Sequence, residues 1–504
     1  SAIITGMYPT AIGTHHMRTT HTNRHTPELP TPYAAVPPPY VKTFTEYLRA
    51  AGYFCTNNQK TDYQFPAPIT AWDECHGRAH WRNRKAPEQP FFAVFNPTGT
   101  HESGMWERED NLPLKTDPDS VELPPYLPNT PKARRALARH YDNLERSDQR
   151  VGELLRQLEE DGLSDNTIVM IWSDHGEGLP RAKRWPYDAG IRIPLIIRWP
   201  GELSAGSASD QLVSLIDLGP TLLSLARVEI PSHMQGQPFL GPDKVERQYV
   251  FATRDRYDEA YDRVRAVRDN QFKYIRNYYP DKERLLWIPY RNRHPVMQEL
   301  WRLQAEDALE VDQQVLFEKR PQEELYDTTV DPHELNNLAE NPLYRETLIR
   351  MRRAHLDWVT EMRDVGLIPE PEIIVREKEL GSRYAILRQE GAKSLVADLR
   401  QVANLGLAGT DALDDLNRAL ASPDAAIRYW ALVGLGNLSE KAAASADAVT
   451  RHLDDPSAIV RIAAARALAR MDLPGPALVV LQEELASSEE WVRLNAAIVL
   501  DEMD

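Results

Sequence analysis

The chain has 504 residues, more than a single hydrophobic core accommodates, so several domains are expected. Its 59 Lys and Arg residues against 75 Asp and Glu residues give a net charge of −16, which argues against a nucleic-acid binder because phosphate binding needs a basic surface. No apolar stretch approaches the roughly 20 residues that span a bilayer, so we expect no membrane span. The two cysteines, Cys55 and Cys75, fit no disulfide or zinc pattern.

The first 245 residues alternate apolar with amphipathic stretches. Short continuous apolar runs are typical of strands buried on both faces, and apolar residues at helical spacing are typical of amphipathic helices. By these patterns we expect strands over 53–56, 91–95, 167–172 and within 191–199, and helices over 41–51, 137–158 and, after a strand end, within 212–225. The alternation predicts an α/β fold, in which a mostly parallel sheet is sandwiched by helices.

After residue 245 the pattern changes to that of a smaller α+β subdomain. A hairpin over 266–275 with its turn at Asp269-Asn270, a strand over 324–327 and a helix over 344–363 are predicted. A charged, proline-containing connector follows. We therefore divide the chain into an α/β domain over 1–245, the smaller subdomain over 246–368, the connector over 369–390 and a helical repeat region over 391–504.

The repeat region is rich in Ala and Leu and has an internal period. Arg428, Arg461 and Arg493 each lie near the start of an apolar helix, at spacings of 33 and 32 residues. A helix pair per period, with the arginine in the second helix, resembles HEAT-type repeats. Each unit can bury its apolar stripe only against a neighbour, so we expect the units to stack. An Ala-rich bundle without repeat geometry is the alternative.

Polar side chains follow three of the predicted strands at the point where each ends. Lys60 follows the first strand, His101 the second, and Asp174 and His175 come directly after the third. In parallel α/β sheets, ligands bind beyond the carboxyl ends of the strands. We therefore expect these side chains to surround one site, although each of them taken singly could be an ordinary loop residue.

The residue types in this predicted site suit a metal and an oxyanion. The carboxylate of Asp174 and the imidazole of His175 can bind a divalent cation. Lys183, eight residues later, can bind a tetrahedral oxyanion as a compact point charge. His101 can donate a proton to a leaving oxygen or hold an oxyanion.

Four segments, in order along the chain, resemble motifs of the sulfatase family of the alkaline-phosphatase superfamily. Residues 1–9 resemble the tail of its Cys-x-Pro-Ser-Arg-x-x-x-Leu-x-Thr-Gly motif, and Lys60 falls at the lysine of Gly-Lys-Trp-His, whose other positions differ here. Residues 173–176 resemble the metal-binding segment. Residues 183–194 resemble Lys-x-x-x-x-Glu-x-Gly-x-Arg-x-Pro, with Asp188 for Glu. Weaker matches at 214–223 and 324–339 extend the resemblance to about residue 365.

The resemblance implies a sulfuric ester hydrolase that removes sulfate from a sulfated small molecule or glycan. Family members use a formylglycine, made from the first Cys or Ser of the motif, and a divalent metal. We expect Ca²⁺ ahead of Mn²⁺ or Zn²⁺. By position, Asp174 and His175 would bind the metal, Lys60 and Lys183 would hold sulfate oxygens, and His101 would contact the sulfate or protonate the leaving group.

A second set of polar residues could contact the substrate beyond its sulfate group. His15, His16 and Arg18 follow the Tyr8-Pro9 turn and are expected near the mouth of the cleft, with Arg256 as a further candidate. Histidine and arginine can hydrogen-bond the hydroxyl and carboxylate groups of a sugar. A structural role in the loop is the alternative.

The nucleophile of the sulfatase motif is not found in these 504 residues. Counting back from Thr5-Gly6, the formylglycine position falls upstream of Ser1, and the family's Asp-Asp metal pair is missing as well. We therefore expect that the true start of the protein is missing and that this chain alone hydrolyses no sulfate ester. The class implies a periplasmic or secreted protein, because sulfated glycans are extracellular.

Two other functions stay open at this point. A phosphodiesterase or phosphonate monoester hydrolase of the same superfamily would share the fold and the metal-binding segment. A non-catalytic protein could use the HEAT-type repeats to recruit a protein partner, since such solenoids offer extended binding surfaces. The repeats could instead pack against the catalytic domain.

Overall fold

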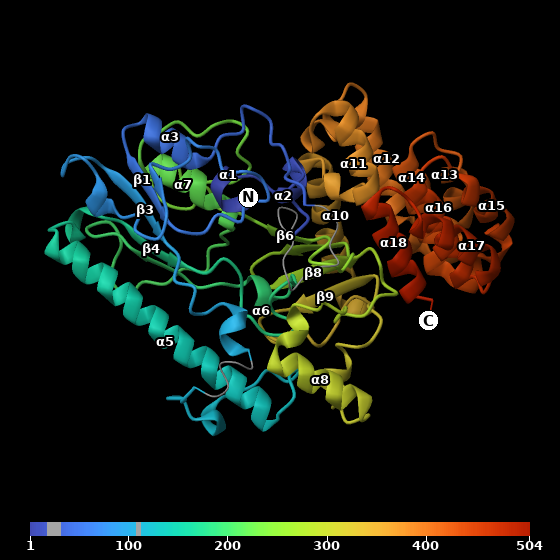
Figure 1. Cartoon of the computed structure of the whole chain (residues 1–504), viewed down its shortest axis with the longest axis horizontal. Helices are drawn as coiled ribbons and strands as arrows, with labels where there is room; N and C mark the ends of the chain where they lie inside the picture. The colour runs from blue at the N-terminus through green and yellow to red at the C-terminus, as the bar shows by residue number, and fades with distance from the viewer. Residues whose placement is uncertain (18–31, 107–111, 504) are drawn as a thin grey trace.

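The computed structural model describes residues 1–17, 32–106 and 112–503 (Figure 1). An α/β part, an antiparallel sheet and a stack of short helices follow one another along the chain and across the molecule. Among the described residues, no helix is both long and apolar enough to cross a membrane.

The α/β part contains a three-stranded parallel sheet. Its strands are β1 (Phe54–Asn58), β2 (Glu74–Cys75) and β3 (Phe91–Phe95), in the order β2-β1-β3, with Thr56 opposite Ala93. Helix α3 (Phe44–Ala50) precedes β1 and begins at a capping box of Thr43 and Glu46. These elements confirm the predicted helix, both strands and their parallel direction.

The next two predicted strands exist but pair differently from the expectation. β4 (Val169–Trp172) and β5 (Leu195–Arg198) form a separate antiparallel ladder, with Met170 opposite Ile197. The segment between them consists of turns and one short helix, α6 (Asp188–Ile191), so no crossover helix carries the chain back to a parallel start. Strands β3 and β4 are half-buried along their whole length, not buried on both faces as expected.

Helices pack around these strands. Helix α5 (Pro131–Glu160) is longer than predicted and begins at Thr130, whose hydroxyl accepts a hydrogen bond from the Ala133 N–H. The strand end expected near residue 212 was wrong, because residues 211–214 form no strand. The helix expected after it is confirmed: a 3₁₀ turn (Leu215–Asp217) leads into α7 (Leu218–Leu225). The other helices of this half are α1 (Ala2–Thr5), α2 (Pro9–Ile12), α8 (Pro295–Ala305) and α9 (Val311–Gln314).

The smaller subdomain is a four-stranded antiparallel sheet covered by one helix. Its strands, in sheet order, are β6 (Val250–Arg254), β7 (Val264–Arg268), β8 (Phe272–Asn277) and β9 (Glu323–Asp327), and the helix is α10 (Arg345–Met362). The predicted hairpin is confirmed, with the Asp269 carboxylate accepting the N–H groups of Gln271 and Phe272 inside the turn.

The C-terminal helices stack in pairs. They are α11 (Glu370–Leu380), α12 (Ala392–Leu405), α13 (Leu413–Ala419), α14 (Ala425–Leu438), α15 (Ala446–Thr450), α16 (Ala458–Arg470), α17 (Pro474–Leu485) and α18 (Glu490–Asp501). The periodic arginines have a structural use: Arg428 pairs with Asp455 at 2.7 Å, and Arg461 pairs with Glu484. These two arginines tie their helices to the following unit, whereas Arg493 lies 3.8 Å from Glu490 of its own helix. All three arginines donate to a backbone carbonyl six residues earlier, in the turn that precedes their helix, and this is the use that recurs once per period.

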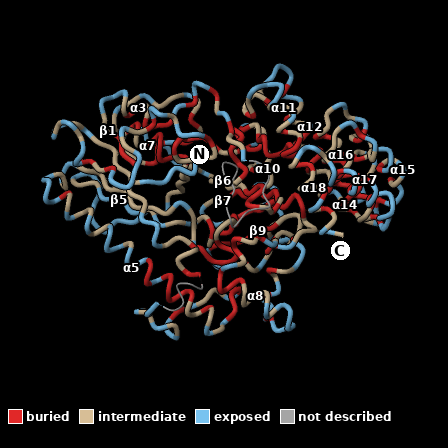
Figure 2. Tube along the Cα trace, viewed as in Figure 1, coloured by how far each residue is buried: buried red, intermediate tan, exposed pale blue. Residues whose placement is uncertain are grey.

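The repeats pack against their own chain. Trp430 in α14 donates its indole N–H to the Leu367 carbonyl at 2.6 Å, and the hydroxyls of Tyr429 and Tyr279 are 2.6 Å apart. One cluster of buried apolar residues extends from α10, the helix that covers the antiparallel sheet, into the helical stack. Figure 2 shows buried residues of all types in red along these elements. This face of the repeats is occupied within the molecule.

Candidate active site

The structure brings together the five side chains that the sequence analysis assigned to one site, namely Lys60, His101, Asp174, His175 and Lys183. The Lys60 Nζ lies 3.1 Å from Asp174 Oδ2, and the Lys183 Nζ lies 3.5 Å from His101 Nε2. Burial and the nearby charge of Lys183 lower the pKa of His101 to about 4, with smaller contributions from Lys60 and His175. Residues from three separate loops therefore act on one another electrostatically at a single site.

Two asparagines that the sequence reasoning missed fix the loop of Lys60. Asn57, in β1, donates a side-chain hydrogen bond to the Lys60 carbonyl at 2.8 Å. Asn96, just after β3, donates to the Asn57 side-chain oxygen at 2.8 Å. These two hydrogen bonds connect the ends of β1 and β3 to each other and to the backbone of Lys60. The position of Asn57 and Asn96 at strand ends could have suggested that they belong to the site. No pattern in the neighbouring sequence, however, shows which residues they bond to.

The turn after β4 sets the direction of Asp174 and His175. The His175 Nδ1 lies 2.7 Å from the Gly176 carbonyl, so Nδ1 carries the ring proton and donates it, and Nε2 keeps its lone pair. That Nε2 is 3.7 Å from Asp174 Oδ1. Burial acts to raise the pKa of Asp174, but the charged hydrogen bond from Lys60 outweighs burial and holds that pKa below its usual value. An ionised carboxylate and a free imidazole nitrogen therefore face each other.

This donor pair is chemically suited to a divalent cation. A neutral imidazole nitrogen whose tautomer is fixed by its other nitrogen is the usual form of a histidine ligand. Among the residues that the structure describes, however, no group of three or more His, Cys, Asp or Glu side chains is placed to hold a metal ion. Asp174 and His175 fit as two ligands of a metal and do not by themselves complete its coordination.

Lys183 and His101 are supported from behind by a buried ion-pair row. The Lys183 Nζ lies 2.9 Å from Glu102 Oε1, and Arg184 forms two hydrogen bonds with the same carboxylate at 2.9 and 3.0 Å. Arg184 also contacts Asp258 at 3.3 Å. Glu102, Arg184 and Asp258 were not among the residues singled out from the sequence, because partners so far apart along the chain leave no local pattern.

The tautomer of His101 follows from its own loop. Its Nδ1 accepts the Ser103 backbone N–H at 3.2 Å and lies 2.8 Å from the Ser103 hydroxyl. The neutral ring therefore carries its proton on Nε2, the atom that faces Lys183. The Nε2–H of His101 is therefore a hydrogen-bond donor located beside the Lys183 ammonium group.

The segment that resembles the tail of the nucleophile motif belongs to the packed elements that lead to Lys60. Helix α1 packs on α3, and α3 packs on β1, the strand that runs into the Lys60 loop.

The second set of predicted residues is not at an open cleft mouth. His16 Nδ1 lies 3.1 Å from Glu370 Oε1, and Arg256 forms two hydrogen bonds with the same carboxylate. His15 packs on His16 with ring centroids 4.2 Å apart, and all three residues are buried. The expected placement was wrong for these residues because Glu370, a carboxylate distant in sequence, holds them in the interior. Arg18 lies outside the described residues.

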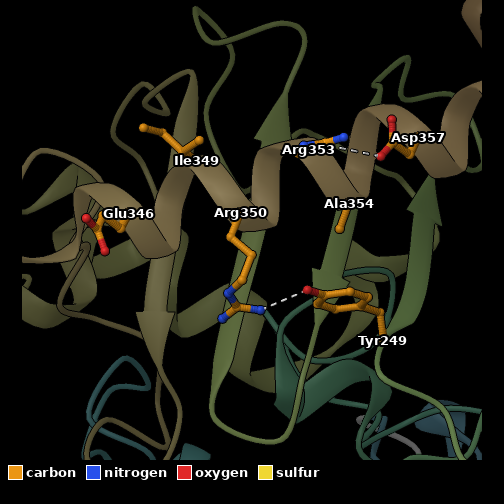
Figure 3. A pocket seen from close by; sticks show the side chains of 7 residues that line it. All are labelled: Tyr249, Glu346, Ile349, Arg350, Arg353, Ala354 and Asp357. Carbon is orange, nitrogen blue, oxygen red and sulfur yellow. Dashed lines mark hydrogen bonds and ion pairs between the residues drawn. The ribbon is translucent and has the colours of Figure 1, made fainter.

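A pocket on the outer face of α10 is separate from these residues. It is lined by Tyr249, Glu346, Ile349, Arg350, Arg353, Ala354 and Asp357 (Figure 3). Within it, Arg350 donates to the Tyr249 hydroxyl at 3.0 Å and Arg353 lies 3.6 Å from Asp357, while Arg350 also pairs with Asp269 at 2.7 Å. None of the sequence-predicted site residues lines it.

Comparison with known proteins agrees with this fold and these segments. A sulfatase family model matches residues 79–228, a model of the C-terminal part of N-sulphoglucosamine sulphohydrolase matches residues 176–292, and a HEAT-repeat model matches residues 396–469 and 413–501. The chain belongs to the sulfatase family. An ulvan-active sulfatase from Formosa agariphila is 46% identical over 411 residues, which are 74% of this chain and 68% of the relative.

More distant relatives extend the comparison. Human N-sulphoglucosamine sulphohydrolase is 29% identical over 324 residues, covering 59% of this chain and 62% of the human protein. Among solved structures, a putative sulfatase from Bacteroides thetaiotaomicron shares the fold with a TM-score of 0.50 at 19% identity, over 72% of this chain and 81% of that one. The two sequence alignments leave about a third of each relative unmatched.

Proposed function

We propose that this chain provides the sulfate-binding part of a sulfatase that acts on a sulfated glycan. The observation that carries the proposal is the meeting of Lys60, His101, Asp174, His175 and Lys183 at one site. Relatives named for activity on ulvan and on N-sulphoglucosamine support the substrate class. Because such glycans are extracellular, we also propose a periplasmic or secreted location.

In this proposal the two lysines neutralise the sulfate group. Their ammonium groups approach it from two loops, and charge on a sulfuryl oxygen is stabilised most by donors that are already in place. Lys183, whose side chain is only 11% exposed, contributes more than Lys60, whose side chain is 39% exposed, because water screens the latter. His101 holds its Nε2 proton toward the same anion and acts there as a hydrogen-bond donor, because its lowered pKa keeps the ring neutral.

Asp174 and His175 would hold the divalent cation of the family, with Ca²⁺ suited to the carboxylate oxygen and Mn²⁺ or Zn²⁺ to the imidazole. A bound cation would polarise a sulfuryl oxygen, and in this family a formylglycine would supply the attacking oxygen. Neither cysteine of the chain lies in the formylglycine motif: Cys55 is buried in β1, and Cys75 is exposed in β2.

The test is the binding of inorganic sulfate by the 504-residue chain in the presence of Ca²⁺, measured by calorimetry. Lys183→Ala should weaken binding by about tenfold or more, since a charged hydrogen bond contributes roughly 1.5–3 kcal/mol, and Lys60→Ala should weaken it less. The control is Lys378→Ala, which removes an exposed lysine of α11. Equal affinity of the three variants and the unmodified chain would contradict the proposal.

A further inference from the structure

Glu102 is a buried carboxylate at the site that the proposed chemistry does not use. Only 1% of the residue is exposed, yet it follows His101 directly and contacts Lys183. Both of its oxygens are occupied: Oε1 by the Lys183 ammonium and the Arg184 Nη2, and Oε2 by the Arg184 Nη1. A negative group so placed would repel sulfate, so it cannot serve as a ligand of the anion.

The position of Glu102 is fixed from several sides. Arg184, whose side chain is 2% exposed, is itself held by Asp258 at 3.3 Å. The loop between His175 and Lys183 packs on the Glu102 backbone so closely that a Cβ on Gly178 would lie 2.9 Å from the Glu102 Cα. The carboxylate is therefore a rigid acceptor, whereas a lysine side chain left alone has many conformations.

The charges explain why such an acceptor is needed. Lys183, Arg184 and His101 bring cationic or proton-donating groups to one buried place, where like charges repel strongly. Interaction with Arg184 and Lys183 holds the pKa of Glu102 well below its usual value, although burial opposes it. The carboxylate thus stays ionised and compensates the two cations behind the sulfate-binding face.

We propose that Glu102 is a positioning residue: it holds the Lys183 ammonium beside His101 Nε2, so that both donors face the same sulfate oxygens. The inference rests on the proposed function. It also accounts for two adjacent pairs in the sequence, His101-Glu102 and Lys183-Arg184, in which each site residue is followed by one partner of the supporting ion pair.

A double-mutant cycle on sulfate affinity tests this role. Calorimetry compares the unmodified chain, Glu102→Gln, Lys183→Ala and the double variant, all with Ca²⁺ present. Removing a negative charge near the anion should by simple Coulomb attraction strengthen binding. We expect the opposite: Glu102→Gln weakens sulfate binding about tenfold in the unmodified chain and less than about twofold in the Lys183→Ala background.

Each other outcome would overturn the inference in a distinguishable way. Unchanged or tighter sulfate binding by Glu102→Gln would show that the carboxylate does not position Lys183. An equal loss in both backgrounds would show a general structural effect. Full affinity in Lys183→Ala alone would instead contradict the sulfate-binding role of the lysine, and with it the proposed function.

Two further variants keep the result interpretable if Glu102→Gln folds poorly. Glu102→Asp retains the charge but withdraws it by one methylene, and should bind sulfate with an affinity between those of the unmodified chain and Glu102→Gln; affinity equal to the unmodified chain would count against positioning. Glu324→Gln is the matched control, because Glu324 is a fully buried carboxylate paired with Arg284 and Tyr187 outside the site. It should lose stability and keep its sulfate affinity.

Discussion

The position of each charged side chain at the site follows from the oppositely charged side chain with which it pairs. Lys60 forms an ion pair with Asp174 near the surface, and Lys183 forms an ion pair with Glu102 in the interior. The same principle applies to Glu370, which is buried and accepts hydrogen bonds from Arg256 while facing His16. An ion pair in the interior is costly to break, because the remaining charge is left without a partner or water.

The buried Glu370 predicts a stability effect that depends on pH. Its pKa is held well below the usual value by Arg256 and His16, against the effect of burial. A lowered carboxylate pKa stabilises the fold above the unfolded-state pKa of about 4.3, and that contribution is lost as the pH falls below it. Glu370→Gln should therefore unfold about 3–5 kcal/mol more easily at pH 7.

The measurement is urea unfolding of the unmodified chain and Glu370→Gln from pH 7 to pH 3. The gap between their free energies of unfolding should shrink by roughly 1.4 kcal/mol per pH unit below about pH 4.3. A gap that is constant over the whole range would mean that the carboxylate contributes no charge-dependent stability.

At the scale of elements, the site depends on how strand ends and turns are joined. Asn57 and Asn96 connect the ends of β1 and β3 under Lys60. The turn after β4 is held against α6 by the Gly176 N–H, which donates to the Gly190 carbonyl at 2.9 Å. A Cβ on Gly176 would lie 1.9 Å from the Ala189 carbonyl oxygen, so only glycine permits this contact.

Gly176→Ala should therefore move the turn that carries Asp174 and His175. We expect a clear loss of thermal stability, because the clash is with backbone and cannot be relieved by a side-chain rotation, together with weaker sulfate binding in the presence of Ca²⁺. The matched control is Gly152→Ala in the middle of α5, where the added Cβ meets only the end of the Arg156 side chain at 3.7 Å.

In the control, alanine should be neutral or should stabilise the helix by about 0.5–1 kcal/mol, because it replaces a flexible residue in a helix interior. Both variants are compared by thermal unfolding and sulfate calorimetry. If Gly176→Ala matched Gly152→Ala in both measurements, the close contact between the turn and α6 would not matter for the site.

Some of this arrangement could be predicted from sequence and some could not. Apolar runs and the arginine period are local patterns, so the strands, the hairpin at Asp269 and the repeats were predictable. Strand direction is not local, and the antiparallel pairing of β4 with β5 was missed. Partners distant in sequence were missed for the same reason: Glu102 lies 82 positions from Arg184, and Arg256 lies 114 positions from Glu370.

At the scale of the whole molecule, the helical repeats and the antiparallel sheet form one packed unit. Trp491 in α18 stacks over the Arg256 guanidinium at 4.4 Å, and Lys282 pairs with Glu502 at 2.9 Å. Asp281 pairs with Arg466 and Arg470 in α16. The repeats therefore pack against the rest of their own chain, which was one of the alternatives left open by the sequence. They contact the smaller subdomain, which also carries Asp258.

The central claim is that loops from separate elements hold one tetrahedral anion, and anomalous diffraction tests it most directly. Crystals of the 504-residue chain would be soaked in selenate, a sulfate analogue, and Ca²⁺, with data collected at the selenium edge. The account predicts a selenium peak within hydrogen-bonding reach of the Lys60 Nζ, the Lys183 Nζ and His101 Nε2. Selenate ordered only elsewhere on the molecule, with these three side chains positioned as they are here, would contradict it.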